Sequence, residues 1–153
     1  GVVTPDLGFL YNNFLGHFNP LPDQPDSIAP GKKQTGSPAT IVLKDDEPYI
    51  AIGAPGGSRI VTSVAQCIVN VVDYGMDMST AVSVPRFHSE ESQLVFLEPA
   101  IAESKAQVLR AMGNEVRRSD YMARVQAIRL SSASGELESG ADPRGGAGVG
   151  RHP

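Results

Sequence analysis

The residues best suited to chemistry are two adjacent glycines, Gly56 and Gly57, which stand between an apolar run and a long helical pattern. Glycine lets the backbone approach a ligand closely because no Cβ stands in the way. The unpaired N–H groups at the start of a helix also favour an anion or a developing oxyanion. A tight turn with Ser58 as the helix N-cap explains the same residues, and such turns are common. Local sequence therefore favours a simple turn and leaves an oxyanion site open.

Other kinds of catalytic or metal site find little support in the sequence. His17, His88 and His152 are widely spaced and form no H-E-x-x-H motif, so we expect no metal and no cofactor. There is no G-x-S-x-G nucleophile motif. The single cysteine, Cys67, lies within the apolar helical pattern, where a buried and unreactive thiol is expected. No side-chain nucleophile is evident.

The segment Asp142-Pro143-Arg144 lies at the start of a glycine-rich tail, 140–153. Its charged side chains are compatible with a solvated turn. They are equally compatible with an ion pair through which Arg144 holds the end of the chain. Spacing alone does not decide between these two interpretations.

Composition limits the class of protein. The chain has 153 residues, of which 41% are hydrophobic and 20% charged, with a formal net charge of -4. These values are typical of one globular domain. No stretch is dense in Lys and Arg, and no apolar stretch is long enough to cross a bilayer, so neither nucleic acid nor membrane is an expected partner. The chain starts at Gly1 without Met, which we interpret as the interior of a longer polypeptide whose compartment stays open.

Periodicity predicts an α+β fold in which helices cover an antiparallel sheet. The helix over 59–74 has a broad apolar face and should lie between layers. Two apolar runs joined by a turn at 45–48 predict a β-hairpin covered on both faces. The expected strands are 40–44, 49–54, 93–97, 115–118 and 125–130, with a short run at 136–138. The further expected helices are a short one through Val82, with Asp77 as its N-cap, and one over 100–112. We expect a sheet-and-helix core over 39–131.

Seven segments, taken in order, resemble the small subunit of the γ-glutamyltransferase (γ-glutamyl transpeptidase) family. They are GFLYNN at 8–13, APGKK at 29–33, SPATIVLK at 37–44, GAPGGSRI at 53–60, DYGM at 73–76, AVSVPRFH at 81–88 and GADPR at 140–144. The resemblance implies the N-terminal-nucleophile hydrolase fold, an αββα sandwich. Residues 1–153 would form the C-terminal portion of that subunit and would lack its N-terminal strands.

The resemblance also implies an activity and a partner. In this family a precursor cleaves itself, and the new N-terminal Thr of the small subunit attacks the γ-glutamyl amide of donors such as glutathione. The acyl group then passes to water, an amino acid or a peptide. That Thr lies upstream of Gly1 in the family, so this chain alone is expected to be inactive and to pair with a large subunit. Its sheet should then expose edges or faces where the missing pieces pack.

Site residues follow from matching positions. Gly56 and Gly57 match the glycines whose N–H groups form the family's oxyanion hole, which reverses the local preference for a simple turn. Thr35 and Gly36 lie near the position of a Ser-Ser pair that holds the glutamyl α-carboxylate. Asn13 matches the second of two asparagines before the acidic residue that binds the substrate's α-amine.

That acidic position is occupied by His17. A histidine cannot pair a cationic amine as a carboxylate does, so the preferred substrate would lack a free α-amine or another group would supply the charge. Three hypotheses follow: part of a γ-glutamyltransferase-like enzyme, a cephalosporin-acylase-like amidase of the same fold, and a non-catalytic relic that binds a partner. Turnover of γ-glutamyl anilides, as opposed to removal of acyl side chains, separates the first two.

Overall fold

The computed structural model describes residues 4, 6, 8–11, 14–25, 27–32, 39–89, 93–130 and 135–145, with only the backbone given for Phe14 and His17. The chain divides into two compact units, 1–36 and 37–153. In the first unit a short 3-10 helix, η1 (Phe14–His17), precedes a turn organised around the buried Ser27. The hydroxyl of Ser27 accepts a hydrogen bond from the Gln24 N–H at 2.8 Å and donates one to the Leu21 carbonyl.

The second unit contains a four-stranded antiparallel sheet in the order β1-β2-β6-β7. Its strands are β1 (Thr40–Lys44), β2 (Glu47–Gly53), β6 (Gln126–Leu130) and β7 (Leu137–Ala141). Asp45 and Asp46 form the predicted hairpin turn with positive φ, which Asp tolerates better than most residues. The predicted core ended at 131 and the predicted tail began at 140, whereas Gly140 and Ala141 are the last residues of β7.

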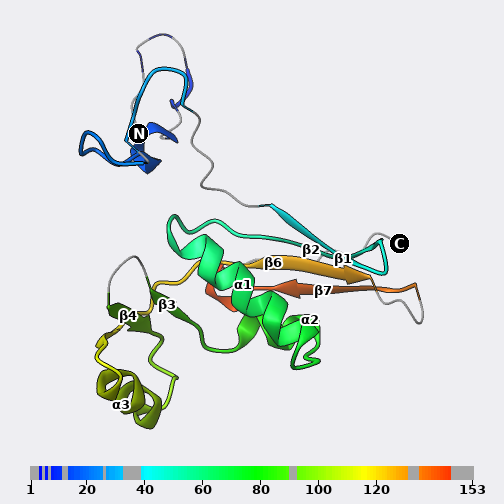
Figure 1. Cartoon of the computed structure of the whole chain (residues 1–153). Helices are drawn as coiled ribbons and strands as arrows, with labels where there is room; N and C mark the ends of the chain where they lie inside the picture. Colours follow the sequence, from blue (N-terminus) through cyan, green and yellow to red (C-terminus); the bar gives the residue numbers. More distant parts are fainter. Residues whose placement is uncertain are drawn as a thin grey trace. The chain divides into compact units, whose positions relative to one another are not determined.

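Helices α1 (Arg59–Val72) and α2 (Met78–Ser83) pack against one face of this sheet (Figure 1). Asp77 caps α2 as predicted, because its carboxylate accepts a hydrogen bond from the Thr80 N–H at 2.8 Å. Ser58 occupies the cap position of α1, but its side chain makes no capping hydrogen bond. The core between helices and sheet includes Ile50, Ile52, Ile60, Val64, Cys67, Val71, Met78, Ala81, Val82, Ala123, Val125 and Ala127.

The expectation that the hairpin is covered on both faces is not met within the described residues. Ile50 and Ile52 are buried under the helices, while Ala51 between them is exposed. Ile41 and Ile128 share the outer face with Ala51 and are 66% and 47% exposed. The sheet therefore presents an apolar outer face as well as an apolar inner one.

A second, three-stranded sheet was not foreseen as separate. It consists of β3 (Phe87–Ser89), β4 (Leu94–Leu97) and β5 (Glu115–Arg118), and β4 and β5 are parallel. The connecting helix α3 (Glu103–Ala111) is shorter than the predicted 100–112. A parallel pair needs such a crossover helix, and the interior of this sheet is a small cluster of Val95, Leu97 and Ala106. The predicted α+β class is confirmed, but a single antiparallel sheet is wrong.

The contact between β7 and α2 depends on a glycine. A Cβ at Gly140 would lie 2.5 Å from the backbone carbonyl oxygen of Met78, whereas a Cβ at Gly53 on β2 would meet nothing within 4 Å. Gly140→Ala should therefore lower the free energy of unfolding by about 1–3 kcal/mol, since a backbone atom cannot move aside as a side chain can. Urea unfolding measures the effect, with Gly53→Ala as the matched control. Equal stabilities of the two variants would contradict the close packing of β7 on α2.

Candidate functional site

The loop between β2 and α1 presents consecutive backbone amides at the start of a helix. Gly57 has φ of 61°, in the left-handed region, and Gly56 has φ of 152°. Their carbonyls accept hydrogen bonds from the N–H groups of Arg59 and Ile60, at 3.3 and 3.2 Å, in the first turn of α1. Within the described part of the chain, the N–H groups of the two glycines donate no hydrogen bond. Both remain available to an anionic atom of a ligand.

Residues 123 and 124, just before β6, pack against the loop of Gly56 and Gly57. The N–H of Arg124 donates a hydrogen bond of 3.1 Å to the carbonyl of Pro55. A Cβ at Gly56 would lie 2.6 Å from both the Cα and the Cβ of Ala123. Gly56 is therefore required by packing, while Gly57, whose Cβ would meet nothing within 4 Å, is favoured by its φ angle.

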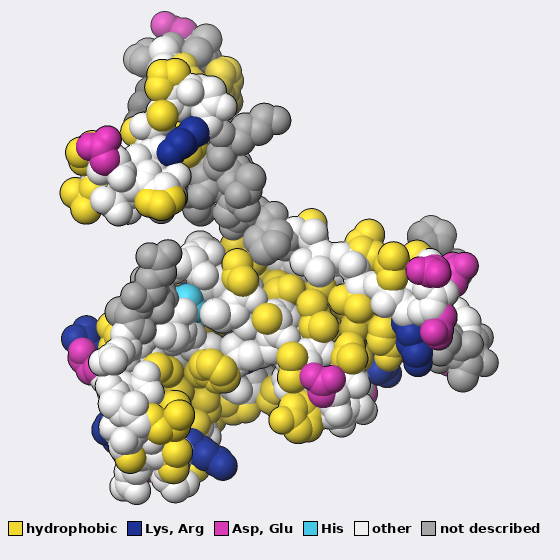
Figure 2. Space-filling model, in the orientation of Figure 1, with side chains coloured by type: hydrophobic (Ala, Val, Ile, Leu, Met, Phe, Trp, Pro, Cys, Tyr) yellow, Lys and Arg dark blue, Asp and Glu magenta, His cyan; other side chains and the backbone are white. Residues whose placement is uncertain are grey.

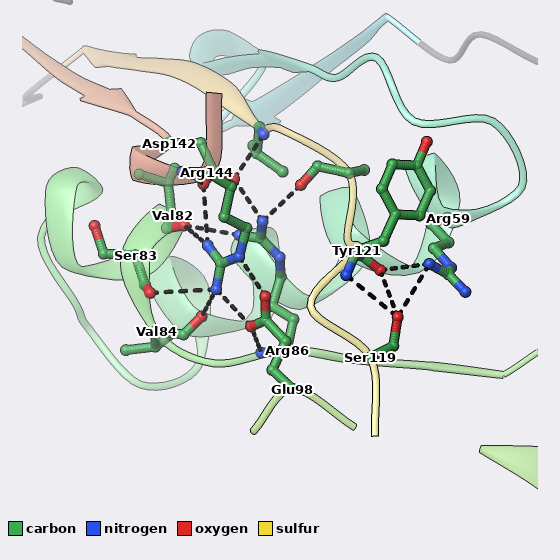
Figure 3. Close-up of polar contacts among 12 residues, drawn as sticks. Arg59, Val82, Ser83, Val84, Arg86, Glu98, Ser119, Tyr121, Asp142 and Arg144 are labelled. Atoms are coloured by element: carbon green, nitrogen blue, oxygen red, sulfur yellow. Dashed lines mark hydrogen bonds and ion pairs between the residues drawn. The ribbon is translucent and has the colours of Figure 1, made fainter. Parts of the chain in front are cut away.

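Arg59 fixes the start of α1 to β4 and to the segment that follows β5. Its guanidinium lies 4.8 Å from the ring centroids of both Phe96 and Tyr121. It also donates hydrogen bonds to the Tyr121 carbonyl at 2.5 Å and to the Ser119 hydroxyl at 3.4 Å (Figure 3). Stacking on aromatic rings and hydrogen bonding together restrict the first residue of α1.

A buried ion pair joins the end of β7 to the segment before β3. Arg86 and Asp142 are both fully buried, and Arg86 Nη2 lies 2.5 Å from Asp142 Oδ2 (Figure 3). Arg86 also donates to the carbonyls of Val82 and Ala123, each at 2.7 Å. Asp142 Oδ2 accepts a further hydrogen bond of 2.8 Å from the Val125 N–H. The pair thus contacts the same backbone segment that supports the glycine loop.

Arg144 completes the cluster and resolves the alternative left open by spacing. Its Nε and Nη2 atoms each lie 2.5 Å from a carboxylate oxygen of Glu98, and its Nη1 lies 3.0 Å from Asp142 Oδ1. Glu98 also accepts a hydrogen bond of 2.7 Å from the Arg86 N–H. The segment Asp142-Pro143-Arg144 is therefore held by ion pairs and is not a solvated turn.

Electrostatics favour the charged forms within this cluster. Burial on its own raises the pKa of Asp142, but hydrogen bonds from the Arg144 N–H, the Arg86 guanidinium and the Val125 N–H outweigh it, so the pKa lies below its ordinary value. Hydrogen bonding to Glu98 raises the pKa of Arg144 above its ordinary value. Asp142 is accordingly an anion at neutral pH.

Cys67 lies at the edge of the cluster, with its Sγ 3.7 Å from Arg86 Nη1. Burial raises the pKa of this thiol, and the side chain is fully buried. The prediction of a buried thiol in the core is therefore confirmed. In the described ranges no three His, Cys, Asp or Glu side chains gather as a metal site. No described helix is long and apolar enough to cross a membrane.

The remaining predicted site residues belong to the first unit. Asn13, Thr35 and Gly36 lie outside the described residues. His17, of which only the backbone is described, is the last residue of η1. The two units are described separately, so the place of these residues relative to Gly56 and Gly57 stays a prediction.

Sequence reasoning missed the residues that lie behind the loop. Glu98 and Ala123 lie in none of the family segments, and Arg86 lies in one of them, 81–88, without an assigned role. For Arg86 a signal existed, since it lies in that family segment between the uncharged residues Pro85 and Phe87. A buried arginine needs a partner distant in sequence, and Asp142 is 56 residues away.

Comparison with known proteins gives a consistent picture. The chain is 32% identical over 153 residues to the glutathione hydrolase proenzyme of Bacillus subtilis strain 168, covering 98% of this chain and 26% of that protein. It is 42% identical over 123 residues to the acylase ACY 1 proenzyme of Pseudomonas sp. strain V22, covering 80% and 22% respectively. The solved γ-glutamyltranspeptidase from Pseudomonas nitroreducens complexed with L-DON superposes with a TM-score of 0.85 at 30% identity, covering 99% of this chain and 86% of that chain.

The solved cephalosporin acylase from Bacillus halodurans superposes with a TM-score of 0.72 at 25% identity, covering 84% of this chain and 25% of that chain. Together the two structures place the chain in the N-terminal-nucleophile hydrolase class of folds. A model of the γ-glutamyltranspeptidase family matches residues 1–151, and the chain belongs to that family. It spans about a quarter of the length of its curated relatives: 26% of the Bacillus subtilis protein and 27% of the glutathione hydrolase proenzyme of Escherichia coli K12.

The lowered pKa of Asp142 predicts how stability depends on pH. A carboxyl whose pKa is lower in the folded than in the unfolded state stabilises fully above its unfolded pKa, about 3.9, and this contribution is lost as pH falls through the folded pKa. Asp142→Asn should cost about 3–5 kcal/mol at neutral pH, because Arg86 is left as an unpaired buried charge. The difference from wild type should shrink in acid.

Urea unfolding between about pH 2 and pH 7 measures this difference. Glu115→Gln is the control, because the Glu115–Arg117 pair is exposed and should contribute little at any pH. A difference between wild type and Asp142→Asn that stays constant down to the lowest pH would contradict an ionised Asp142.

Proposed function

We propose that this chain supplies the oxyanion hole of an enzyme that cleaves γ-glutamyl amide bonds, with glutathione-like donors, and passes the acyl group to water, amino acids or peptides. The observation that carries the proposal is the loop Gly56–Gly57, whose two N–H groups are free of protein acceptors among the described residues at the start of α1. Membership of the γ-glutamyltranspeptidase family supports it.

The chemistry needs a nucleophile from the part of the enzyme upstream of this chain. The Thr hydroxyl adds to the γ-carbonyl carbon and its proton passes to the α-amine of the same Thr. The carbonyl oxygen becomes an anion that the N–H groups of Gly56 and Gly57 stabilise. When this tetrahedral intermediate collapses, the C–N bond breaks, the amine leaves with the proton, and an ester remains. Water or an acceptor amine then attacks the ester and releases the Thr.

Recognition of the glutamyl group is assigned to the first unit. Thr35 and Gly36 would hold the α-carboxylate, and Asn13 and His17 would lie beside the α-amine. The hydroxyl of Thr35 and a backbone amide suit a carboxylate, whereas a neutral histidine offers an amine only one acceptor nitrogen. The histidine therefore weakens selection for a free α-amine.

The partner would be the large subunit of the same precursor. The helix α1 carries an exposed apolar stripe in which Val61, Val69 and Val72 are 62%, 42% and 53% exposed. Hydrophobic side chains gather on the face formed by α1 and the neighbouring strands (Figure 2). Contiguous exposed apolar surface of this kind is typical of a protein interface. Such a partner would cover the broad face of the helix.

An acylase acting on amides without a free α-amine is a second candidate. The replacement of the family's acidic residue by His17 favours it, and the similarity to the acylase ACY 1 proenzyme supports it. The nucleophile and oxyanion loop would be the same in both enzymes. The two candidates differ only in the group recognised beside the scissile amide.

Replacing Gly57 tests the oxyanion assignment. In the complete enzyme, Gly57→Val should lower kcat by about 10²–10³, or roughly 2.7–4 kcal/mol, because a side chain there forces the N–H away from the oxyanion. Gly75→Val is the matched control: Gly75 also has positive φ (65°) and open space around it, but it follows α1 at the opposite end. Unchanged kcat in Gly57→Val, measured with a γ-glutamyl anilide, would exclude the oxyanion role.

Replacing His17 tests the substrate class. A carboxylate at this position pairs an ammonium group, so His17→Asp should raise kcat/KM for a γ-glutamyl anilide relative to the des-amino glutaryl anilide. About tenfold, or 1.4 kcal/mol, is expected for one charge pair. A ratio identical to wild type would remove His17 from the substrate site. Turnover of neither substrate by the wild-type enzyme would instead favour the non-catalytic hypothesis.

A further inference from the structure

We propose that the buried pair Arg86–Asp142 positions the oxyanion loop, acting through the backbone of residues 123–125. The inference rests on the proposed function of Gly56 and Gly57. Neither charged residue touches the glycines, so both are positioning residues and not catalytic ones.

The first step joins the ion pair to the backbone segment. Arg86 Nη2 donates to the carbonyl of Ala123 at 2.7 Å, and Asp142 Oδ2 accepts from the N–H of Val125 at 2.8 Å. The two side chains therefore hold the backbone on both sides of Arg124. Arg86 Nη2 lies 2.5 Å from Asp142 Oδ2, so the two side chains form one rigid unit, which we call the bracket.

The second step joins this segment to the loop. The Arg124 N–H donates to the Pro55 carbonyl at 3.1 Å, and Ala123 packs so closely behind Gly56 that no Cβ fits between them. Both contacts involve backbone atoms or a Cβ, which cannot swing away as a long side chain can. A displacement of the segment is therefore passed to Gly56 and Gly57.

The third step shows why the bracket is rigid. Among the described residues, four groups donate to the Asp142 carboxylate: Arg86 and the Val125 N–H to Oδ2, and the Arg144 N–H and Nη1 to Oδ1. Glu98 in turn holds Arg144 and the backbone N–H of Arg86. The carboxylate has no alternative orientation that keeps these four contacts.

Stability alone does not account for such a cluster. The Nε of Arg86 is buried without a hydrogen-bond partner in the described structure. A buried ion pair gains little over well-packed apolar side chains, and an unsatisfied buried donor adds a cost. Fixing the geometry of the segment at the loop is a function that apolar side chains could not supply, since they cannot bind the Ala123 carbonyl and the Val125 N–H together.

The test uses the complete, processed enzyme and two inhibitors. A boronic acid in which boron replaces the γ-carbonyl carbon of glutamate forms a tetrahedral adduct with the Thr and so needs the oxyanion hole, whereas glutamate carries only the recognition groups. Asp142→Asn should weaken binding of the boronic acid on the order of tenfold and lower kcat in parallel. It should leave the inhibition constant of glutamate and KM within about twofold. Loss of one donor outright costs about 10²–10³, so a displaced loop should lose less.

Glu138→Gln is the matched control, since the ion pair Glu138–Arg129 lies on the same sheet, between β6 and β7, and forms no hydrogen bond with residues 123–125 in the described part of the chain. It should change neither inhibition constant. If Asp142→Asn fails to fold or mature, Ala123→Gly decides, because it keeps the ion pair and removes the Cβ behind Gly56. Here too weaker binding of the boronic acid alone is expected.

Two results overturn the inference while the proposed function stands. One is a wild-type affinity for the boronic acid in the deciding variant, and the other is an equal loss of affinity for both inhibitors, which indicates general disruption. By contrast, a wild-type enzyme that neither cleaves γ-glutamyl anilides nor binds the boronic acid would reject the proposed function itself.

Discussion

The contact between Arg86 and Asp142 is the interaction on which the second unit depends. It joins the segment before β3, the end of β7 and the segment before β6, which are separate parts of the chain. Two charges buried together stabilise only when geometry and hydrogen bonding are complete, and removing one of them is costly. Glu98 and Arg144 supply that completion. Asp142 and Arg144 are thereby tied to the rest of the domain.

The same cluster explains why two adjacent glycines are needed for different reasons. Gly56 lies against Ala123, whose carbonyl is bound by Arg86, so its lack of a side chain is a matter of packing. Gly57 has a left-handed backbone in open space, so its lack of a side chain is a matter of conformation. Packing fixes where the loop lies, and conformation fixes which way its amides turn.

Apolar surface on both sides of the main sheet fits a chain that works within a larger assembly. The inner face buries Ile50 and Ile52 beneath α1 and α2, while the outer face exposes Ile41 and Ile128. Helix α1 likewise has an apolar stripe on each side. In a four-layer αββα arrangement a second sheet covers the outer face, which is the arrangement that the family resemblance implies. The proposed partnership with a large subunit gives both surfaces an occupant.

Local signals in the sequence were sufficient for the elements whose cause is local. The hairpin at Asp45, the cap at Asp77 and the amphipathic helix α1 each depend on residues within one or two turns of chain, and family motifs spread over the chain identified the fold. The sequence did not reveal the separate three-stranded sheet, the inclusion of Gly140 in β7, or the ion pairs of Arg86 and Arg144. The pairs Arg86–Asp142 and Arg144–Glu98 join residues 56 and 46 positions apart, and the two sheets depend on the packing of whole elements. Only the tertiary structure decides such contacts, because burial and not spacing determines which charge an arginine must meet.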